Sequence, residues 1–345
     1  MFLPLSSFIG KCASLRGFNF PHLNFSDFPH PGYFFHFFCN TSSKWPIGGM
    51  TLPRCFLKNK TYLVTRRISQ RQYRLRPTRL NRQIFLYCVA IAAQKTGVQI
   101  HAVCVLSNHW HVVVSDPEAR IAEFYGWVHE YVAKAVNCSQ GRRENLWSSD
   151  KTSVIPLESS EDVLDKIIYT LCNPVSAQLI AKAKNWKGVW LYAKHHAQTV
   201  KRPEIYFREN GNMPEFISLE ITKPPCFAEH TWDSYEQMVE TDIARREGEI
   251  AKEMQHTGKQ FMGMDAVMKQ GFSNSPTNHE QRRQLNPKIA AKDKWLRIDA
   301  INRYKQFIAE YWNALKEWQK GHRDIIFPPG AYALRIYAGV NVQPG

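Results

Sequence analysis

The stretch VQIHAVCVLSNHWHVVVSD, residues 98–116, most narrows the folds open to this chain. It reads as two apolar strands rich in β-branched residues, which favour strands, joined by a tight Ser-Asn turn. Consecutive strands with so short a connection pair antiparallel. Alternate strand residues share a face, so His109 and His111 project side by side and Trp110 points the other way. Two neighbouring imidazoles are able to bind a divalent cation.

The order of the neighbouring elements predicts the fold class. Helical apolar spacing indicates helices over 78–97 and 118–138. Strand patterns cover 61–68 and 153–157, the latter at a sheet edge because it contains a proline. With the two central strands, the order is strand, helix, strand, strand, helix, strand. This is the split βαβ pattern of a ferredoxin-like α+β fold, an antiparallel sheet with helices on one face.

A further helix is predicted to begin at Ser159 or Ser160, because serine is a good N-cap ahead of an acidic first turn. Beside its apolar stripe runs a polar row at four-residue spacing, formed by Asp165, Tyr169 and Asn173. Side chains four residues apart lie one above another on a helix. The proline that follows Asn173 cannot donate a backbone hydrogen bond, so it is expected to kink or restart the helix.

The positive charge of the chain is concentrated in one segment. The formal net charge is +15, and residues 51–115 hold eleven Lys and Arg and no acid, whereas 116–345 hold 31 basic and 29 acidic residues. This concentration of positive charge favours a nucleic-acid phosphate backbone as the partner of the segment. The alternatives are a basic face that only contacts solvent, or binding to an anionic membrane surface. The side chains expected to follow DNA are Lys58, Lys60, Arg66, Arg67, Arg71, Arg74, Arg76, Arg79 and Arg82, with Tyr62 and Tyr73 as stacking partners for bases.

Three regions are predicted along the chain. Residues 1–49 hold ten of the twenty phenylalanines without periodicity, and we interpret them as a non-native or disordered extension. Residues 50–184 carry the histidine pair, and 185–345 form an accessory region with long helices. In that region, 231–256 is predicted to be an exposed helix. The apolar stripe of a helix over 288–320 is predicted to pack in a core, with DNA binding as the second choice.

Composition limits the cellular setting. The eight cysteines are scattered without metal-ligand spacing, which suits reduced thiols rather than a disulfide framework. No apolar run is long enough to span a membrane. These features predict a cytoplasmic protein without a membrane partner, and the expected DNA partner implies association with the nucleoid.

Residues 58–180 resemble the REP-associated tyrosine transposases, a branch of the HUH single-strand DNA transposases and nucleases. His109-Trp110-His111 after a strand matches the HUH motif, with Trp110 at its apolar position. Tyr169 followed by Asn173-Pro174-Val175 matches the tyrosine helix. The resemblance implies that Tyr169 attacks a DNA phosphate and forms a 5′-phosphotyrosine link, so that single-stranded DNA is cut and rejoined at hairpin-forming repeats.

The same resemblance implies a metal site. His109, His111 and Asn173 would bind Mg²⁺ or Mn²⁺. Related branches have glutamine at the third position, and Asp165 lies on the same helical row as Asn173, so either residue could be the third ligand.

Other interpretations remain open. The chain could be a domesticated, catalytically inactive relative that binds hairpin DNA or RNA. A weaker option is a mononuclear metal enzyme unrelated to DNA, which the acid-free basic segment disfavours. Taken singly, a histidine pair on an apolar strand more often packs in a core, and so does a tyrosine on a half-apolar helix. The sequence is compatible with a monomer or a homodimer.

Overall fold

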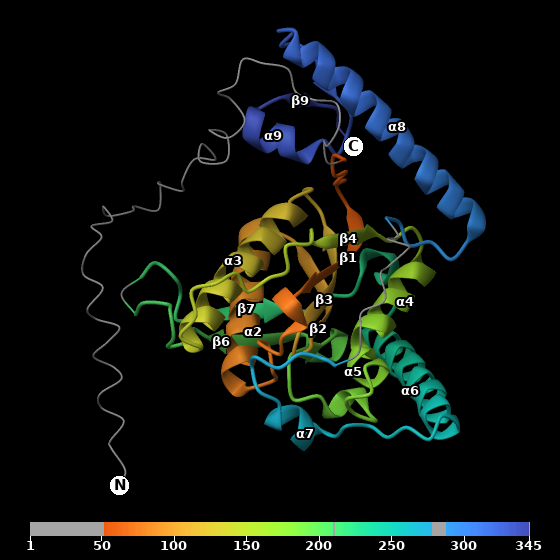
Figure 1. Ribbon diagram of the computed structural model, residues 1–345. Helices are drawn as coiled ribbons and strands as arrows, with labels where there is room; N and C mark the ends of the chain where they lie inside the picture. Colours follow the sequence, from red (N-terminus) through yellow and green to blue (C-terminus); the bar gives the residue numbers. More distant parts are fainter. Residues whose placement is uncertain (1–51, 210, 278–287, 345) are drawn as a thin grey trace. The chain divides into compact units, whose positions relative to one another are not determined.

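The structure is a computed structural model, and it describes residues 52–209, 211–277 and 288–344. The predicted 1–49 extension therefore lies outside the described residues. Five antiparallel strands form the main sheet in the order β4-β1-β3-β2-β5, with β3 at its centre (Figure 1). These strands are β1 Lys60–Arg67, β2 Gln99–Val105, β3 His109–Asp116, β4 Ser153–Pro156 and β5 Trp190–Leu191.

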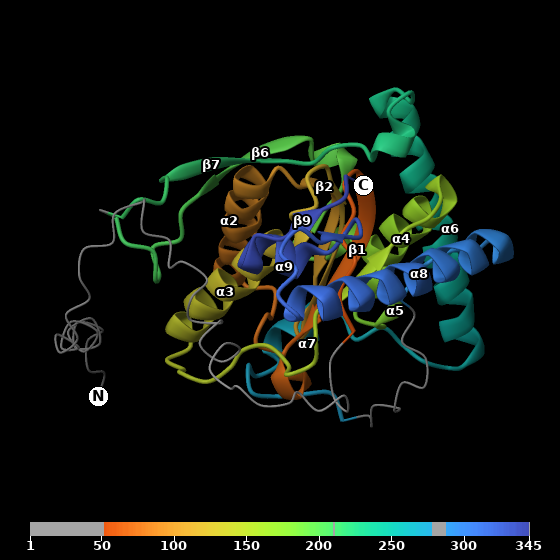
Figure 2. The ribbon, with the colours of Figure 1, turned by 90° about the horizontal axis from the view of Figure 1, so that it is seen from above.

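Helices cover both faces of this sheet, with α2 and α3 on one side and α4 and α6 on the other (Figures 1 and 2). The helices are α2 Arg79–Thr96, α3 Ile121–Ser139, α4 Ser160–Leu171, α5 Asn173–Ser176, α6 Trp232–His256, α7 Met264–Lys269, α8 Lys294–Gln319 and α9 Tyr332–Ala338. The α+β class and the split βαβ order are confirmed. The two helices of that repeat share one face as predicted, and α4, which follows the repeat, covers the opposite face.

Smaller elements complete the described chain. A hairpin of β6 and β7 packs on α2, and a parallel pair of β8 and β9 lies beside α8. Their bounds are β6 Ala197–Lys201, β7 Phe216–Glu220, β8 Ile326–Phe327 and β9 Asn341–Val342. Short 3₁₀ turns are η3 Ser69–Arg71, η4 Ala183–Asn185, η5 Ala193–His195 and η6 Pro225–Phe227.

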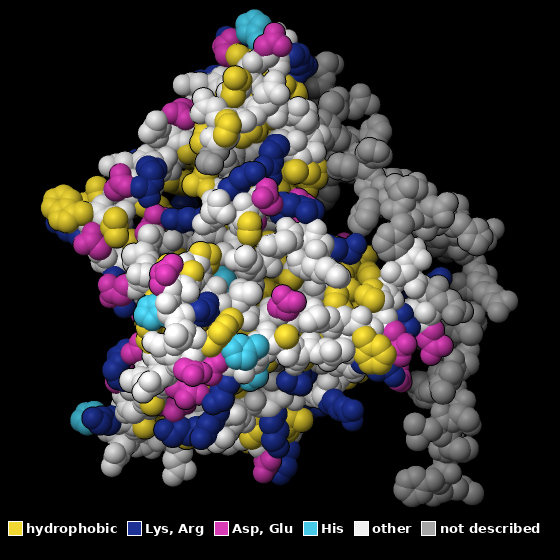
Figure 3. All heavy atoms as spheres, turned by 180° about the vertical axis from the view of Figure 1, so that it is seen from behind, with side chains coloured by type: hydrophobic (Ala, Val, Ile, Leu, Met, Phe, Trp, Pro, Cys, Tyr) yellow, Lys and Arg dark blue, Asp and Glu magenta, His cyan; other side chains and the backbone are white. Residues whose placement is uncertain are grey.

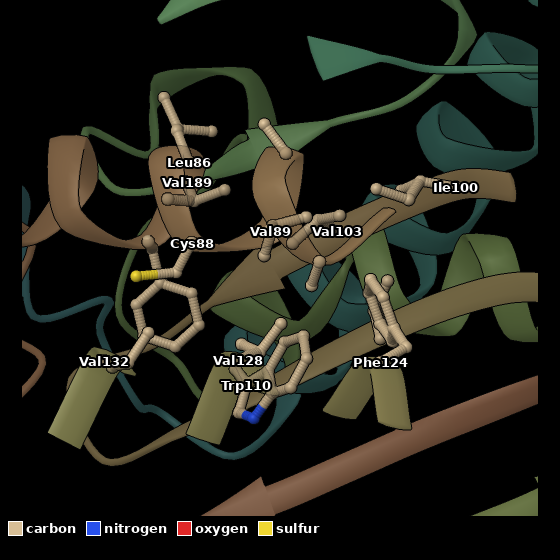
Figure 4. Packing of buried hydrophobic residues seen from close by; sticks show 14 of the residues in the cluster. Leu86, Cys88, Val89, Ile100, Val103, Trp110, Phe124, Val128, Val132 and Val189 are labelled. Carbon is tan, nitrogen blue, oxygen red and sulfur yellow. The ribbon is translucent and has the colours of Figure 1, made fainter. Parts of the chain in front are cut away.

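Strand alternation sorts the central side chains between the two faces. Trp110, Val112 and Val114 of β3 belong to the core beneath α2 and α3. Figure 4 shows Trp110 beside residues of α3, among them Phe124 and Val128. Val113, which points the other way, packs in the core beneath α4 and α6. The period of two therefore sends the side chains of His109 and His111 toward the face that α4 covers.

Capping residues fix the ends of α2 and α4, and the N-cap predicted at Ser159 is among them. The Thr78 hydroxyl accepts a hydrogen bond from the Asn81 amide at 3.1 Å, and α2 ends at Gly97, whose φ is 73°. Such a φ suits glycine because it has no Cβ. At α4, Ser159 and Asp162 form a reciprocal capping box. The proline at 174 does restart the helix, because α4 ends before it and α5 begins anew.

The starts of two helices and the environments of two helices differ from the predictions. Helix α3 starts at Ile121 rather than 118, because the Asp116 carboxylate accepts from the amides of Arg120 and Ile121 at 2.8 and 2.7 Å and so caps it. The helix predicted over 231–256 is present as α6 and most of its residues are exposed, but the prediction missed a buried face. One face of α6 is buried against α4. This face consists of Tyr235, Val239, Ile243, Glu247, Ile250 and Met254.

The last long helix is only partly a core element. It begins at Lys294 rather than 288, after an Asp293 N-cap. Phe307 and Tyr311 are buried as expected, but Trp295 near its start is 72 % exposed. Core packing is therefore correct for the second half of the apolar stripe and wrong for the first. Within the described residues, no helix is long and apolar enough to cross a membrane.

Segments beyond residue 184 contact the sheet and α4. Strand β5 pairs with β2, so the sheet takes its last strand from this region. The Ala290 amide donates to the Pro156 carbonyl at 3.1 Å, and the Lys292 amide donates to Asp162 Oδ1 at 2.8 Å. Asp162 is buried and also caps α4. The stretch before α8 is thereby fastened to the first turn of α4.

Candidate active site

The floor of the site is the antiparallel ladder of β1 and β3. Thr65 lies directly opposite His111, and Arg67 lies directly opposite His109. Directly opposed residues point to the same face of a sheet. These four side chains therefore share the face that α4 covers. The rings of His109 and His111 lie 4.9 Å apart between centroids, with their planes almost perpendicular.

The helical side of the site brings the other two predicted residues to the histidines. The Tyr169 ring lies 5.3 Å from the His111 ring between centroids. From the next helix, Asn173 Oδ1 lies 3.3 Å from His109 Nε2. Tyr169 is 46 % exposed, whereas His111 and Asn173 are buried. The tyrosine is therefore not a core residue, and part of its side chain faces solvent.

The surroundings of His109 favour positive charge. Its Nδ1 lies 2.6 Å from Asn108 Oδ1, and its Nε2 faces Asn173 Oδ1. Both amide oxygens only accept hydrogen bonds, and a neutral imidazole has one N–H. Two acceptors on one ring suit either a second proton or a cation beside Nε2. Adjacent ligands of an octahedral ion with bonds of about 2.1 Å lie about 3 Å apart, so the 3.3 Å between His109 Nε2 and Asn173 Oδ1 fits such an ion.

His111 is oriented by its strand neighbour. Its Nδ1 lies 2.8 Å from the Thr65 hydroxyl. Histidines that bind a metal through one nitrogen generally hydrogen-bond through the other. With Nδ1 of both histidines bonded to protein groups, Nε2 is in each case the nitrogen suited to a ligand.

Asp165, the alternative third ligand, is engaged elsewhere. Its carboxylate lies 2.8 Å from Lys166 Nζ and 3.2 Å from Lys292 Nζ. Burial would raise the pKa of Asp165, but hydrogen bonds and charge from the two lysines outweigh it and lower the pKa. Of the two candidates, Asn173 is the one that contacts His109. No group of three or more His, Cys, Asp and Glu side chains in the described part of the chain is arranged to hold a metal, so the candidate set depends on this amide.

Several predicted DNA-binding residues contact other parts of the protein. Lys60 Nζ lies 2.9 Å from the buried carboxylate of Glu158. The Arg66 guanidinium donates to Ser148 O and Thr152 Oγ1 at 2.8 and 3.0 Å, and burial lowers its pKa. These two side chains therefore also have a structural role.

Two further arginines hold loops. Arg76 donates to the Gln270 carbonyl at 2.5 Å and lies over the Phe272 ring at 4.2 Å. Arg74 donates to Gln140 Oε1 at 3.2 Å.

The remaining predicted arginines lie nearer the site or on the surface. Arg71 lies in the η3 turn beside Asn108, and Arg67 lies on the site face of β1. Of the basic residues near the start of α2, Arg79 and Arg82 are exposed.

The predicted stacking role of Tyr62 is wrong. Tyr62 is 1 % exposed, and its hydroxyl accepts from the Leu57 amide at 2.8 Å. Tyr73 is only partly buried and remains available for such a role.

On the face shown in Figure 3, Lys and Arg are interspersed with Asp and Glu, so no single uninterrupted positive surface covers this face.

Sequence reasoning missed two residues that contact the histidines, Thr65 and Asn108. Asn108 was interpreted only as part of a turn, although it directly precedes the motif. Thr65 does not stand out in the sequence, because Thr61 and Arg67 are polar residues on the same face of β1. The partner of Thr65 also depends on the register between β1 and β3, which the sequence does not give.

The solved structures that are similar to this chain include the following two. One is a REP-associated tyrosine transposase bound to a REP hairpin, with 16% identity, a TM-score of 0.35, and coverage of 40% of this chain and 80% of that chain. The other is a protein of Deinococcus radiodurans R1 provisionally named a transposase, with 16% identity, a TM-score of 0.25, and coverage of 38% and 97%. No protein-family model matches the chain, and the search of curated proteins found no match.

Proposed function

We propose that this protein is a metal-dependent transposase or endonuclease of single-stranded DNA, with Tyr169 as nucleophile. The observation that carries the proposal is the half-exposed Tyr169 ring against His111, in a group where His109 also contacts Asn173. His109, His111 and Asn173 would hold Mg²⁺ or Mn²⁺. Hairpin-forming repeats are the proposed DNA, by analogy with the similar transposase that was solved with a REP hairpin.

Attack by the Tyr169 hydroxyl requires an activating group. A phenol has an ordinary pKa near 10 and is a weak nucleophile at neutral pH. When bound, the cation would polarise the scissile phosphate and offset its developing charge. The Tyr169 oxygen then forms a bond to phosphorus and loses its proton. The bond from phosphorus to the 3′ oxygen breaks, and that oxygen takes up a proton as a free 3′-hydroxyl. Because the phosphotyrosine ester keeps the bond energy, rejoining needs no ATP.

The proposal predicts a covalent adduct that depends on metal. The full chain is incubated with end-labelled single-stranded hairpin DNA from repeats near its gene, with Mg²⁺, Mn²⁺ or EDTA. A denaturing gel should show a slowly migrating protein–DNA band with either metal and none with EDTA. An adduct that persists in EDTA would contradict metal dependence. Tight binding to the hairpin without an adduct under any condition would favour the alternative, a binding protein that does not cut DNA or RNA.

A second prediction concerns Arg67, which shares the site face with the histidines. Arg67→Gln should weaken binding to single-stranded DNA and reduce the slope of log K against log salt by about 0.7, the value for one lost phosphate contact. Fluorescence anisotropy between 50 and 200 mM salt measures both. Arg245→Gln is the control, because Arg245 pairs with Asp242 and Glu249 on α6. A slope equal to that of the unchanged protein would exclude Arg67 from the DNA surface.

A further inference from the structure

We propose that Asn108 and Thr65 are positioning residues that set the tautomers of the histidine pair. Through them, the Nδ1 atoms of His109 and His111 carry the proton and both Nε2 atoms present a lone pair to a divalent cation. The inference rests on the proposed function in one respect, since it takes the two histidines as metal ligands. It assigns the orientation of the pair to two side chains outside the predicted site.

The orientation of the Asn108 amide is fixed by its own contacts. Its Nδ2 donates to the Arg71 carbonyl at 3.3 Å, so Oδ1 is the atom turned to His109 Nδ1, at 2.6 Å. The backbone carbonyl of Asn108 also accepts from the Ile68 amide at 2.8 Å. An amide oxygen only accepts hydrogen bonds, so His109 Nδ1 must carry a proton. Nε2 of the neutral ring is then a lone-pair donor beside Asn173.

The carbonyl that holds Asn108 comes from a strained turn. Gln70 and Arg71 have φ values of 53° and 58° in succession. A left-handed conformation costs a non-glycine residue about 1–2 kcal/mol. Two backbone hydrogen bonds hold the turn in this conformation. The Ser69 amide donates to the Leu146 carbonyl at 2.9 Å, and the Arg71 amide donates to the Ile68 carbonyl at 3.2 Å. Backbone strain of this kind is concentrated where a functional group must be oriented.

The second histidine is fixed across the sheet. Thr65 and His111 are directly opposed in the β1–β3 ladder, and the hydroxyl lies 2.8 Å from Nδ1. The hydroxyl is able to donate or accept. If Thr65 accepts, His111 has the same tautomer as His109, with Nε2 as the ligand atom. His111 and Asn173 are buried, which leaves water little room to take over this role.

The test measures Mn²⁺ binding to the full chain by titration calorimetry and by the electron paramagnetic resonance signal of free Mn²⁺. Thr65→Val and Asn108→Leu keep the number of side-chain heavy atoms and the branch point, and they remove the hydrogen bond to the histidine. Each should raise the Kd for Mn²⁺ by about 10- to 100-fold, the usual effect of losing such a partner. Thr65→Ser keeps the hydroxyl and should restore binding to within about 3-fold.

Matched control variants make the same two substitutions at a threonine and an asparagine that do not contact the histidines. Thr61 lies on the same face of the same strand and bonds to Ser115 at 2.7 Å. Asn137 holds the Glu144 carbonyl at 2.6 Å and lies outside the site. Thr61→Val and Asn137→Leu should leave the Kd unchanged. If they weaken Mn²⁺ binding as much as Thr65→Val and Asn108→Leu do, the effect is one of stability and the inference is overturned.

A second readout does not depend on metal. In ¹⁵N-histidine-labelled, metal-free protein, His109 and His111 should show the Nδ1-protonated tautomer, and Asn108→Leu should convert His109 to a mixture. Unchanged tautomers and unchanged Kd in both variants, with a normal DNA adduct, would overturn the positioning role and leave the proposed function intact. Shifted tautomers and weakened Mn²⁺ binding, with no adduct from the unchanged protein, would support the positioning role and reject the DNA chemistry. Absence of Mn²⁺ binding to the unchanged protein would overturn the role in metal positioning.

Discussion

Tyr169→Phe is expected to abolish the covalent protein–DNA adduct while DNA binding remains. The substitution removes one oxygen and keeps the ring, so packing against His111 persists. Loss of a nucleophile typically lowers a rate by several orders of magnitude, and we expect adduct formation to fall at least about 10³-fold. The measurement is the initial rate of adduct formation on a denaturing gel, beside hairpin affinity by anisotropy.

Tyr206→Phe supplies the matched control for this experiment. Tyr206 is 41 % exposed, close to the 46 % of Tyr169. Its replacement should leave both adduct formation and hairpin affinity unchanged. If Tyr169→Phe forms the adduct at the unchanged rate, another residue is the nucleophile. If it also loses hairpin binding, Tyr169 contributes to recognition, and the rate must then be measured at saturating DNA.

The part of the site that could be predicted from sequence is the part set by local periodicity. The period of two in a strand places His109 and His111 on one face, and the helical spacing of four predicts Asn173 near Tyr169. The chain keeps the two residues on the same side of the site although α4 ends at Leu171 and Asn173 begins α5. Each rule needs only the type of element, which the apolar patterns indicate. The structure adds that the strand face and the helix row meet, which is visible as the contact between His109 and Asn173.

The roles of the basic residues could not be predicted in the same way, because they depend on distant partners. Arg66 and Arg67 are neighbours in the chain but point to opposite faces of β1. Arg66 binds the loop at 148–152, and Lys60 binds Glu158, which is 98 residues away in sequence. A count of charges per segment gives the attraction toward an anion. It does not reveal which side chains the protein uses for its own packing.

The protonation of His101, a buried histidine on β2, also depends on partners that are distant in the sequence. His101 lies at a bulge of β2 and is 0 % exposed. Its Nδ1 lies 2.9 Å from the Thr222 carbonyl, and its Nε2 lies 2.8 Å from the Ser115 hydroxyl. A carbonyl only accepts, so Nδ1 carries the proton and Nε2 accepts from serine. The neutral ring is fully satisfied, and burial lowers the pKa of His101 from 6.5 to about 4.

We therefore expect the free energy of unfolding to fall as the pH falls from about 6.5 to about 4. Above pH 6.5 the ring is neutral in both states and has no effect. Below it, the unfolded chain binds a proton that the folded protein excludes until about pH 4. The 2.5-unit interval corresponds to a loss of about 3 kcal/mol. Burial also lowers the pKa of His129, which adds to the slope.

Urea unfolding at intervals between pH 7 and 4 measures how the free energy of unfolding falls. The variant His101→Gln shows how much of this fall is due to His101. The glutamine amide keeps a donor for the Thr222 carbonyl and an acceptor for the Ser115 hydroxyl, but it does not titrate. The variant should lose about 1.4 kcal/mol less per pH unit than the unchanged protein across this interval, even if it is less stable at pH 7. Parallel curves for the two proteins would mean that His101 has an ordinary pKa in the folded protein and takes up its proton there as readily as in the unfolded chain. In that case the Ser115 hydroxyl would turn to donate to Thr61, to which it is bonded at 2.7 Å, and its oxygen would accept from the protonated Nε2 of His101.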